Sequence, residues 1–146
     1  MREHTVVGHQ IVSQVQFPWP QVPEIVRWHH ERGDGSGYPD GLHGDETPQA
    51  VRIIALADSF DAMTSERPYR ERLSVGSALH ELIRLTPQQY DPQALQALLI
   101  QVRRDAVGSN RIPVLEPNTV NLSPSDVDQL ASMLQHRITR NRAYFI

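Results

Sequence analysis

The apolar residues of this chain recur at helical spacing, in segments that are separated by proline and glycine. Apolar side chains three and four residues apart share one face of a helix, and no segment shows the alternation typical of a strand. On this basis helices are predicted at residues 1–16, 23–32, 48–64, 74–85, 92–104 and 124–139. The pattern therefore predicts an all-α fold.

Three of the predicted helices begin with the same signal, a capping side chain followed by proline. The pairs that carry it are Thr47-Pro48, Asp91-Pro92 and Ser123-Pro124. The side-chain oxygen can accept from a free N–H of the first turn, and proline suits the first helical position because its φ is preset. Asp126 follows Ser123 at the spacing of a capping box.

Three of these helices have a clear apolar stripe. The stripe that we expect to face a core in residues 74–85 consists of Ala78, Leu79, Leu82 and Ile83. The stripe of the first helix consists of Val7, Ile11, Val12 and Val15. The last helix has a narrow one, made of Val127, Leu130, Leu134 and Ile138.

A stretch rich in proline, asparagine and glycine interrupts the helical pattern after residue 104. We expect residues 105–122 to form a linker. The chain of 146 residues is then predicted to consist of a main body at 1–104 and an appended amphipathic helix at 123–146. This length suits one domain of ordinary size.

Composition excludes several kinds of chemistry. The chain has no cysteine, which excludes disulfides and thiolate metal sites, and every one of its 14 basic residues is arginine. A net charge of -3 offers no broad cationic field, so we expect no nucleic-acid partner. The apolar runs are too short to span a bilayer and the first residues do not read as a signal peptide. We therefore expect a cytoplasmic protein that binds no membrane.

The densest polar segment is HHERGDGSGYP at residues 29–39. Neighbours on a helix are about 100° apart, so His29 and His30 would face different ions of a closely spaced pair. The glycines permit sharp turns and close approach to a ligand, and Tyr38 would hold its phenol over the cleft. The alternative for the histidine pair is one packed imidazole and one solvated imidazole.

A second polar group follows in residues 58–70. Asp58 interrupts an apolar helix, where an ionised carboxylate is costly to bury unless it is paired or binds metal. Asp61 lies one turn further on, and Arg67 and Arg70 are suited to bidentate contacts with phosphate. The alternatives are carboxylates that cap or pair with the next loop, which suits Asp61 better than Asp58, and solvated surface arginines.

The segments HHERGDGSGYP and ADSFDAMTSERPYR together resemble the two signatures of the HD-GYP subfamily of the HD phosphohydrolase superfamily. Upstream, MREHTVVGHQIV is similar to the family's helix that carries a metal-binding histidine, and YDPQALQALL is similar to its closing helix. The resemblance covers residues 1–102. It implies the C-terminal part of an HD-domain helical bundle, followed here by the linker and the appended helix.

The resemblance also implies roles for single residues. The implied metal ligands are His4, His29, His30 and Asp58, and the last three are also the implied catalytic residues. The implied substrate contacts are Tyr38, Arg67 and Arg70, together with the loop residues Asp34, Gly35 and Gly37. Asp61 would orient a ligand. The histidines without an implied role are His9, His43, His80 and His136.

The family hydrolyses cyclic di-GMP to pGpG, and in some members onward to GMP, with two or three bound iron or manganese ions. The resemblance therefore implies a metal-dependent phosphodiesterase of bacterial second-messenger signalling, with cyclic di-GMP as its ligand. A dimer is a further expectation.

The chain contains no His-Asp dipeptide, for which the superfamily is named. We therefore expect the chain to begin inside the family's domain, with the dyad-bearing half or another signalling domain as a partner. Apolar stripes that this half would cover are expected to face solvent. The alternatives are a non-catalytic module that binds the nucleotide or a protein, an inactive gene remnant, and a hydrolase of mononucleotides.

Overall fold

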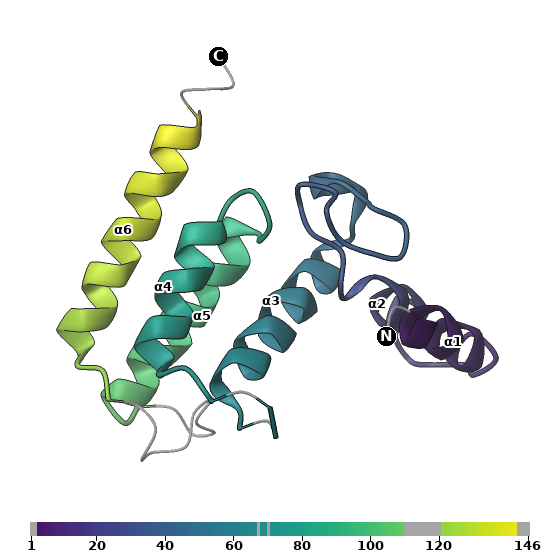
Figure 1. The fold of residues 1–146 in the computed structure, drawn as a ribbon, viewed down its shortest axis with the longest axis horizontal. Helices are drawn as coiled ribbons and strands as arrows, with labels where there is room; N and C mark the ends of the chain where they lie inside the picture. Colours follow the sequence, from purple (N-terminus) through teal and green to yellow (C-terminus); the bar gives the residue numbers. More distant parts are fainter. Residues whose placement is uncertain (1–2, 67, 70, 110–120, 143–146) are drawn as a thin grey trace. The chain divides into compact units, whose positions relative to one another are not determined.

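The computed structural model describes residues 3–66, 68–69, 71–109 and 121–142, and it is helical throughout these ranges apart from loops and one isolated β-bridge (Figure 1). The helices are α1 (Glu3–Val12), α2 (Val22–Trp28), α3 (Gln49–Thr64), α4 (Val75–Leu85), α5 (Pro92–Ala106) and α6 (Pro124–Arg142). A single 3-10 turn, η1, covers Gly44–Glu46. The predicted all-α class is confirmed. Among the described helices, none combines the length and the hydropathy needed to cross a membrane.

The two N-terminal helices are shorter than their apolar patterns predict. α1 ends at Val12, where Gln14 donates its N–H to the carbonyl of Ile11 and the chain tightens into a turn. α2 ends at Trp28 rather than at residue 32, because the N–H of Glu31 bonds to the carbonyl of Trp28 at 2.8 Å. This early end of α2 places the two following histidines in a turn.

The chain forms two compact units, each with its own packing. The first consists of residues 1–58 and 88–91. Within it α1 packs on α2, and the backbones approach closely because Gly8 has no side chain: a Cβ there would lie 2.9 Å from Val26. Thr5 is fully buried on this side of α1, whereas Val7 and Ile11 are exposed. Val7 and Ile11, which belong to the predicted stripe of α1, thus face solvent.

The second unit consists of residues 59–87 and 92–146 and contains α4, α5 and α6 side by side (Figure 1). The predicted core face of α4 is confirmed, since all its members are buried. The predicted stripe of α6 is buried at Val127, Leu130 and Leu134. We expected α6 to be appended beyond a linker; in the structure these three side chains pack it into the same unit as α4 and α5.

The start of α6 is the capping box that its sequence predicts. Ser123 accepts from the N–H of Asp126 at 3.2 Å, and the carboxylate of Asp126 accepts from the N–H of Ser123 at 2.8 Å. At the start of α3, the hydroxyl of Thr47 instead donates to the carbonyl of Gly44 at 3.0 Å. The side chain of Thr47 therefore closes the 3-10 turn that precedes α3.

Candidate metal centre

The loop of residues 33–44 is closed at its base by backbone hydrogen bonds. Gly44 donates to the carbonyl of Gly33 at 3.0 Å, and Gly33 donates to the carbonyl of Gln89 at 3.0 Å. Asp34 and His43 form an isolated antiparallel bridge just inside this base. The loop is therefore held against residues 88–91, which belong to the same compact unit.

The carboxylate of Asp34 makes hydrogen bonds within the loop. One of its carboxylate oxygens accepts from the N–H of Ser36 at 3.0 Å and from its hydroxyl at 2.6 Å. Burial raises the pKa of Asp34, but the hydrogen bonds from Ser36 outweigh it and hold this pKa below its usual value. Gly35, with φ of +75°, lies so close to the ring of His43 that a Cβ there would be 2.5 Å from it. Asp34 and Gly35 thus shape the loop, and a contact of either residue with substrate stays a prediction.

Gly37 brings the loop back against the residues that follow α2. A Cβ at this position would lie 2.4 Å from the backbone nitrogen of Arg32 and 2.6 Å from the carbonyl oxygen of His30. The next residue, Tyr38, donates its N–H to that same carbonyl at 3.3 Å. Only glycine permits this approach, which places Tyr38 beside the histidines.

Two acidic residues that sequence reasoning left without a role hold this loop. Glu31 is buried, and its carboxylate accepts from three backbone N–H groups of residues 40–42. Asp40 accepts from the side chains of Arg27 and Trp28. In the sequence, Glu31 lies between the histidine pair and the glycine-rich segment. This position is the sequence feature that could have pointed to a role for Glu31. Its burial could not be read from the sequence.

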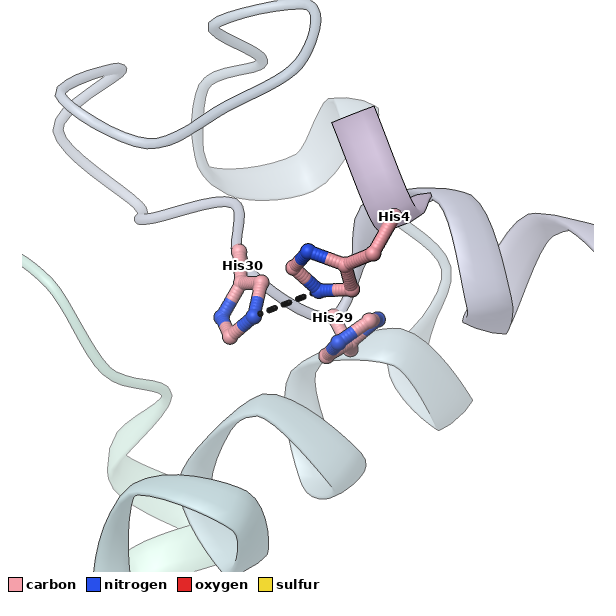
Figure 2. Close-up of side chains that lie close together, drawn as sticks. All are labelled: His4, His29 and His30. Atoms are coloured by element: carbon pink, nitrogen blue, oxygen red, sulfur yellow. Dashed lines mark hydrogen bonds between the residues drawn. The ribbon is translucent and has the colours of Figure 1, made fainter. Parts of the chain in front are cut away.

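Three imidazoles meet where α1 begins and α2 ends. His4 comes from the first turn of α1, and His29 and His30 directly follow α2. Figure 2 shows the three rings turned toward one another, and one nitrogen from each lies within 4.8 Å of the other two. Nε2 of His4 and Nε2 of His30 are 3.1 Å apart, and the centroids of the His29 and His30 rings are 4.1 Å apart.

This arrangement differs from the expected separation of His29 and His30 around a helix. Because α2 ends at Trp28, the pair lies in a turn, and both rings reach the same centre as His4. Within the part of the chain that the structure describes, these three histidines form a group of potential metal donors. The geometry therefore suits one ion that all three imidazoles face.

The distances in the cluster fit metal coordination. Two nitrogens bound at right angles, with bonds of about 2.1 Å, lie about 3.0 Å apart, and nitrogens on opposite sides of an ion lie about 4.2 Å apart. The 3.1 Å between His4 and His30 corresponds to the first case. All three nitrogens lie within 4.8 Å of one another, so a small contraction brings any pair to the second distance. The same short distance is also that of a hydrogen bond between the two rings.

The protonation of the rings also suits ligation. Nδ1 of His29 lies 2.9 Å from the carbonyl oxygen of Val26, so this nitrogen carries the proton and Nε2 keeps its lone pair. A backbone carbonyl in this position commonly orients a metal-bound histidine. Burial is the main cause that lowers the pKa of His30 to about 4; His29 adds to it, and Asp58 opposes it. His30 is therefore neutral at neutral pH.

Asp58 lies next to His30 but not among the three converging nitrogens. Its Oδ2 is 3.9 Å from Nδ1 of His30, the ring nitrogen opposite the one that faces His4. The side chain of Asp58 is 44% exposed, so the cost of burying an ionised carboxylate is not what requires a partner for it. The nearby apolar side chains Ile53 and Ile54 of α3 are themselves exposed. The apolar sequence around Asp58 therefore does not mean that this part of the helix is buried.

Tyr38 stands over one side of the cluster. The centroid of its ring is 4.7 Å from that of His30 and 6.4 Å from that of His4. A groove of about 360 Å³ begins here, lined by Glu3, Val6, Val7, Gln10, Tyr38 and Pro39. The structure thus provides an open, largely apolar surface beside the imidazoles.

Three sets of residues from the sequence analysis remain. Arg67 and Arg70 lie outside the described residues, so their contact with phosphate stays a prediction. Asp61 accepts from the hydroxyl of Ser65 at 3.0 Å, which fits the alternative of a carboxylate used at the end of its own helix. His80 and His136 lie on α4 and α6, in the other compact unit.

Fold and site together define a helical domain with a cluster of three histidines, which could hold a metal ion, beside a glycine-rich loop. A model of the HD domain family matches residues 1–94, and the chain belongs to this family of metal-dependent phosphohydrolases. The family assignment confirms the resemblance found in the two signature segments.

The curated relatives are phosphodiesterases of cyclic dinucleotides. The chain is similar to a cyclic di-GMP phosphodiesterase of Thermotoga maritima, with 44% identity over 68% of the chain and 27% of the relative. It is also similar to the cyclic di-GMP phosphodiesterase response regulator RpfG of Xanthomonas campestris pv. campestris, with 43% identity over 68% of the chain and 26% of the relative. A 3'3'-cGAMP-specific phosphodiesterase 2 of Vibrio cholerae is 36% identical over 68% of the chain and 19% of the relative. The chain spans about a quarter of the length of the first two relatives.

Proposed function

We propose that this chain takes part in the metal-dependent hydrolysis of a cyclic dinucleotide, with cyclic di-GMP as the first candidate substrate. The observation that carries the proposal is the convergence of His4, His29 and His30 beside the loop that presents Tyr38. Three imidazoles that converge on one point are a suitable donor set for a metal ion, whereas a packed or solvated histidine pair needs no third ring.

The names of the relatives support a cyclic dinucleotide and leave two candidates for its bases. Two of the most similar relatives are named for cyclic di-GMP, and others are named for 3'3'-cGAMP. Both molecules present the same chemistry to the site, a phosphodiester bond in a ring with two nucleobases. We propose cyclic di-GMP first and 3'3'-cGAMP second, with pGpG and then GMP as the products of the first.

The metal that we propose is iron or manganese. Imidazole and carboxylate donors without a thiolate suit these ions. His4, His29 and His30 would hold the ion. Asp58 is proposed as a further ligand, which requires a turn of its side chain or of the His30 ring, because its Oδ2 lies beside Nδ1 of His30. When bound, the metal ion would supply Lewis-acid activation of the phosphodiester and would lower the pKa of a coordinated water.

The chain's own groups would orient the substrate around this centre. The hydroxyl of Tyr38 can donate to a phosphate oxygen, because its ring lies beside His30 and its backbone is fixed by the carbonyl of that residue. The apolar groove next to Tyr38 can receive part of a nucleobase. Arg67 and Arg70 are proposed to contact the phosphates, since guanidinium groups bind them in a bidentate manner.

The proposal is tested by assaying the manganese-loaded chain with cyclic di-GMP and, in parallel, with 3'3'-cGAMP, with the products separated by chromatography. His29→Ala and Asp58→Ala are expected to lower turnover by more than about 100-fold, because each removes a proposed ligand. His80→Ala is the matched control, since it removes an imidazole from α4. Arg67→Ala is expected mainly to raise KM.

The outcomes separate the candidate functions. Turnover by His29→Ala at the level of His80→Ala would contradict a role of the cluster in hydrolysis. Binding of cyclic di-GMP by the wild-type chain without any turnover would instead support the non-catalytic module. An unchanged KM in Arg67→Ala would contradict the contact of this arginine with phosphate.

A further inference from the structure

Two carboxylates, Glu31 and Asp40, fasten the loop to the end of α2. The side chain of Glu31 is 4% exposed. Its Oε1 accepts from the N–H groups of Asp40 at 2.7 Å and Gly41 at 3.1 Å, and its Oε2 accepts from Leu42 at 3.0 Å. A buried carboxylate with three such donors is strongly held, because hydrogen bonds to a charged acceptor are roughly twice as strong as neutral ones.

Asp40 makes the second half of this attachment. Its Oδ2 accepts from Nε of Arg27 at 2.7 Å and from the indole N–H of Trp28 at 2.6 Å. Its Oδ1 accepts from Nη2 of Arg27, also at 2.7 Å. Its own backbone N–H is the one that bonds to Glu31. Residue 40 is therefore bound by side chains on both sides of the histidine pair, since Arg27 and Trp28 precede His29 and Glu31 follows His30.

We propose that Glu31 and Asp40 are positioning residues that hold His29 and His30 in register with His4 and keep Tyr38 beside them. This inference rests on the proposed metal centre. Between His30 and Tyr38 the chain makes a tight turn, in which Tyr38 bonds back to the carbonyl of His30 at 3.3 Å. Movement of the loop therefore moves the backbone that carries the imidazoles.

The cluster is sensitive to such movement. Its three nitrogens lie within 4.8 Å of one another, only slightly wider than one ion requires. Bonds of about 2.1 Å require these nitrogens to close to about 4.2 Å or less, so a shift of the turn that moves the rings apart would oppose binding of the ion. Groups outside the ligand set that orient the ligands commonly change metal affinity by about 10-fold to 100-fold when they are replaced.

The variant Glu31→Gln tests the inference with little change in shape. The amide keeps one oxygen, but its NH2 group would face the N–H of Leu42, donor against donor. Glu46→Gln is the matched control, because Glu46 also accepts a backbone N–H, from His43 at 2.7 Å, and it lies on the exposed surface.

Two measurements on the full chain are compared for these variants. The first records the NMR signals of the histidine rings in the metal-free protein. In Glu31→Gln the signals of His4, His29 and His30 should move, whereas those of His80 and His136 should not. The second is titration with Mn²⁺, whose affinity should fall about tenfold in Glu31→Gln and stay unchanged in Glu46→Gln.

Cluster signals and Mn²⁺ affinity that are the same in Glu31→Gln and Glu46→Gln would overturn the inference. If Glu31→Gln fails to fold, Asp40→Asn replaces it, because this partly exposed residue loses only side-chain bonds and should give the same two effects. A wild-type chain that binds no Mn²⁺ would refute the metal centre. The ring signals would then still decide whether the two carboxylates position the imidazoles.

Discussion

Gly37 lies where the loop and the turn after α2 touch, and its missing side chain decides the local geometry. The nearest atoms to a Cβ at this position are backbone atoms of Glu31, Arg32 and His30, at 2.4 to 2.6 Å. Backbone atoms cannot rotate aside as the end of a flexible side chain can. The position therefore requires glycine for space, and not for a positive φ.

Replacement of Gly37 by alanine is expected to destabilise the protein by about 1–3 kcal/mol, the usual range for overpacking. It should also weaken Mn²⁺ binding, because the displaced backbone carries His30. Urea unfolding and a Mn²⁺ titration measure the two effects.

Gly44→Ala is the control in the same loop, where the nearest atom to a Cβ is 4.0 Å away and φ is not positive. A loss of stability in Gly44→Ala equal to that in Gly37→Ala would contradict the steric explanation.

At the scale of single elements, the apolar stripe of α6 forms the buried face of that helix. Leu134 is completely buried, and its neighbour Met133 is 44% exposed, as the two faces of an amphipathic helix require. The salt bridge from Arg103 on α5 to Asp128 lies on the exposed rim, where ion pairs contribute little. The burial of the stripe, rather than the ion pair, is what holds α6.

Leu134→Ala is therefore expected to lower the free energy of unfolding by roughly 2–5 kcal/mol, the range for leucine in a core. Met133→Ala, one position earlier, should change it by less than about 0.5 kcal/mol, as surface substitutions do. Denaturant unfolding of both variants measures the difference. Equal and small effects would show that α6 does not pack into the core in solution.

At the scale of the whole molecule, the candidate metal centre belongs to one compact unit. His4, His29, His30 and Asp58 all lie in the unit of residues 1–58 and 88–91. The other unit has a closely packed core of leucines, which include Leu79, Leu82, Leu95 and Leu134, each buried. An ion bound at the cluster should therefore stabilise the first unit most.

Mn²⁺ at 100 times its dissociation constant is expected to stabilise the native state by about 2.7 kcal/mol. Hydrogen exchange followed by mass spectrometry should show new protection in α1, in the turn after α2 and in the loop, with little change in α6. A chelator should remove this added protection, and Mn²⁺ should not produce it in His30→Ala. Uniform protection across both units, or protection retained in His30→Ala, would count against a metal bound at this cluster.

The sequence by itself determined the helices and the candidates for chemistry. Helical periodicity is a local property, so the core face of α4 and the stripe and capping box of α6 could be read from spacing alone. The signature segment HHERGDGSGYP likewise singled out His29 and His30, and the upstream segment MREHTVVGHQIV singled out His4, before any geometry was known. The ends of α1 and α2 were less well predicted, because a backbone turn and not the apolar pattern ends each of them.

The tertiary structure alone decided which of these groups meet. His4 and His30 are 26 positions apart, and only the packing of α1 on α2 brings their nitrogens to 3.1 Å. The burial of Glu31 depends on amides nine to eleven positions further along, and the exposure of Asp58 depends on which faces of α3 are covered. Spacing along a chain reports only which residues share a face, whereas burial and contact depend on every element that folds against that face.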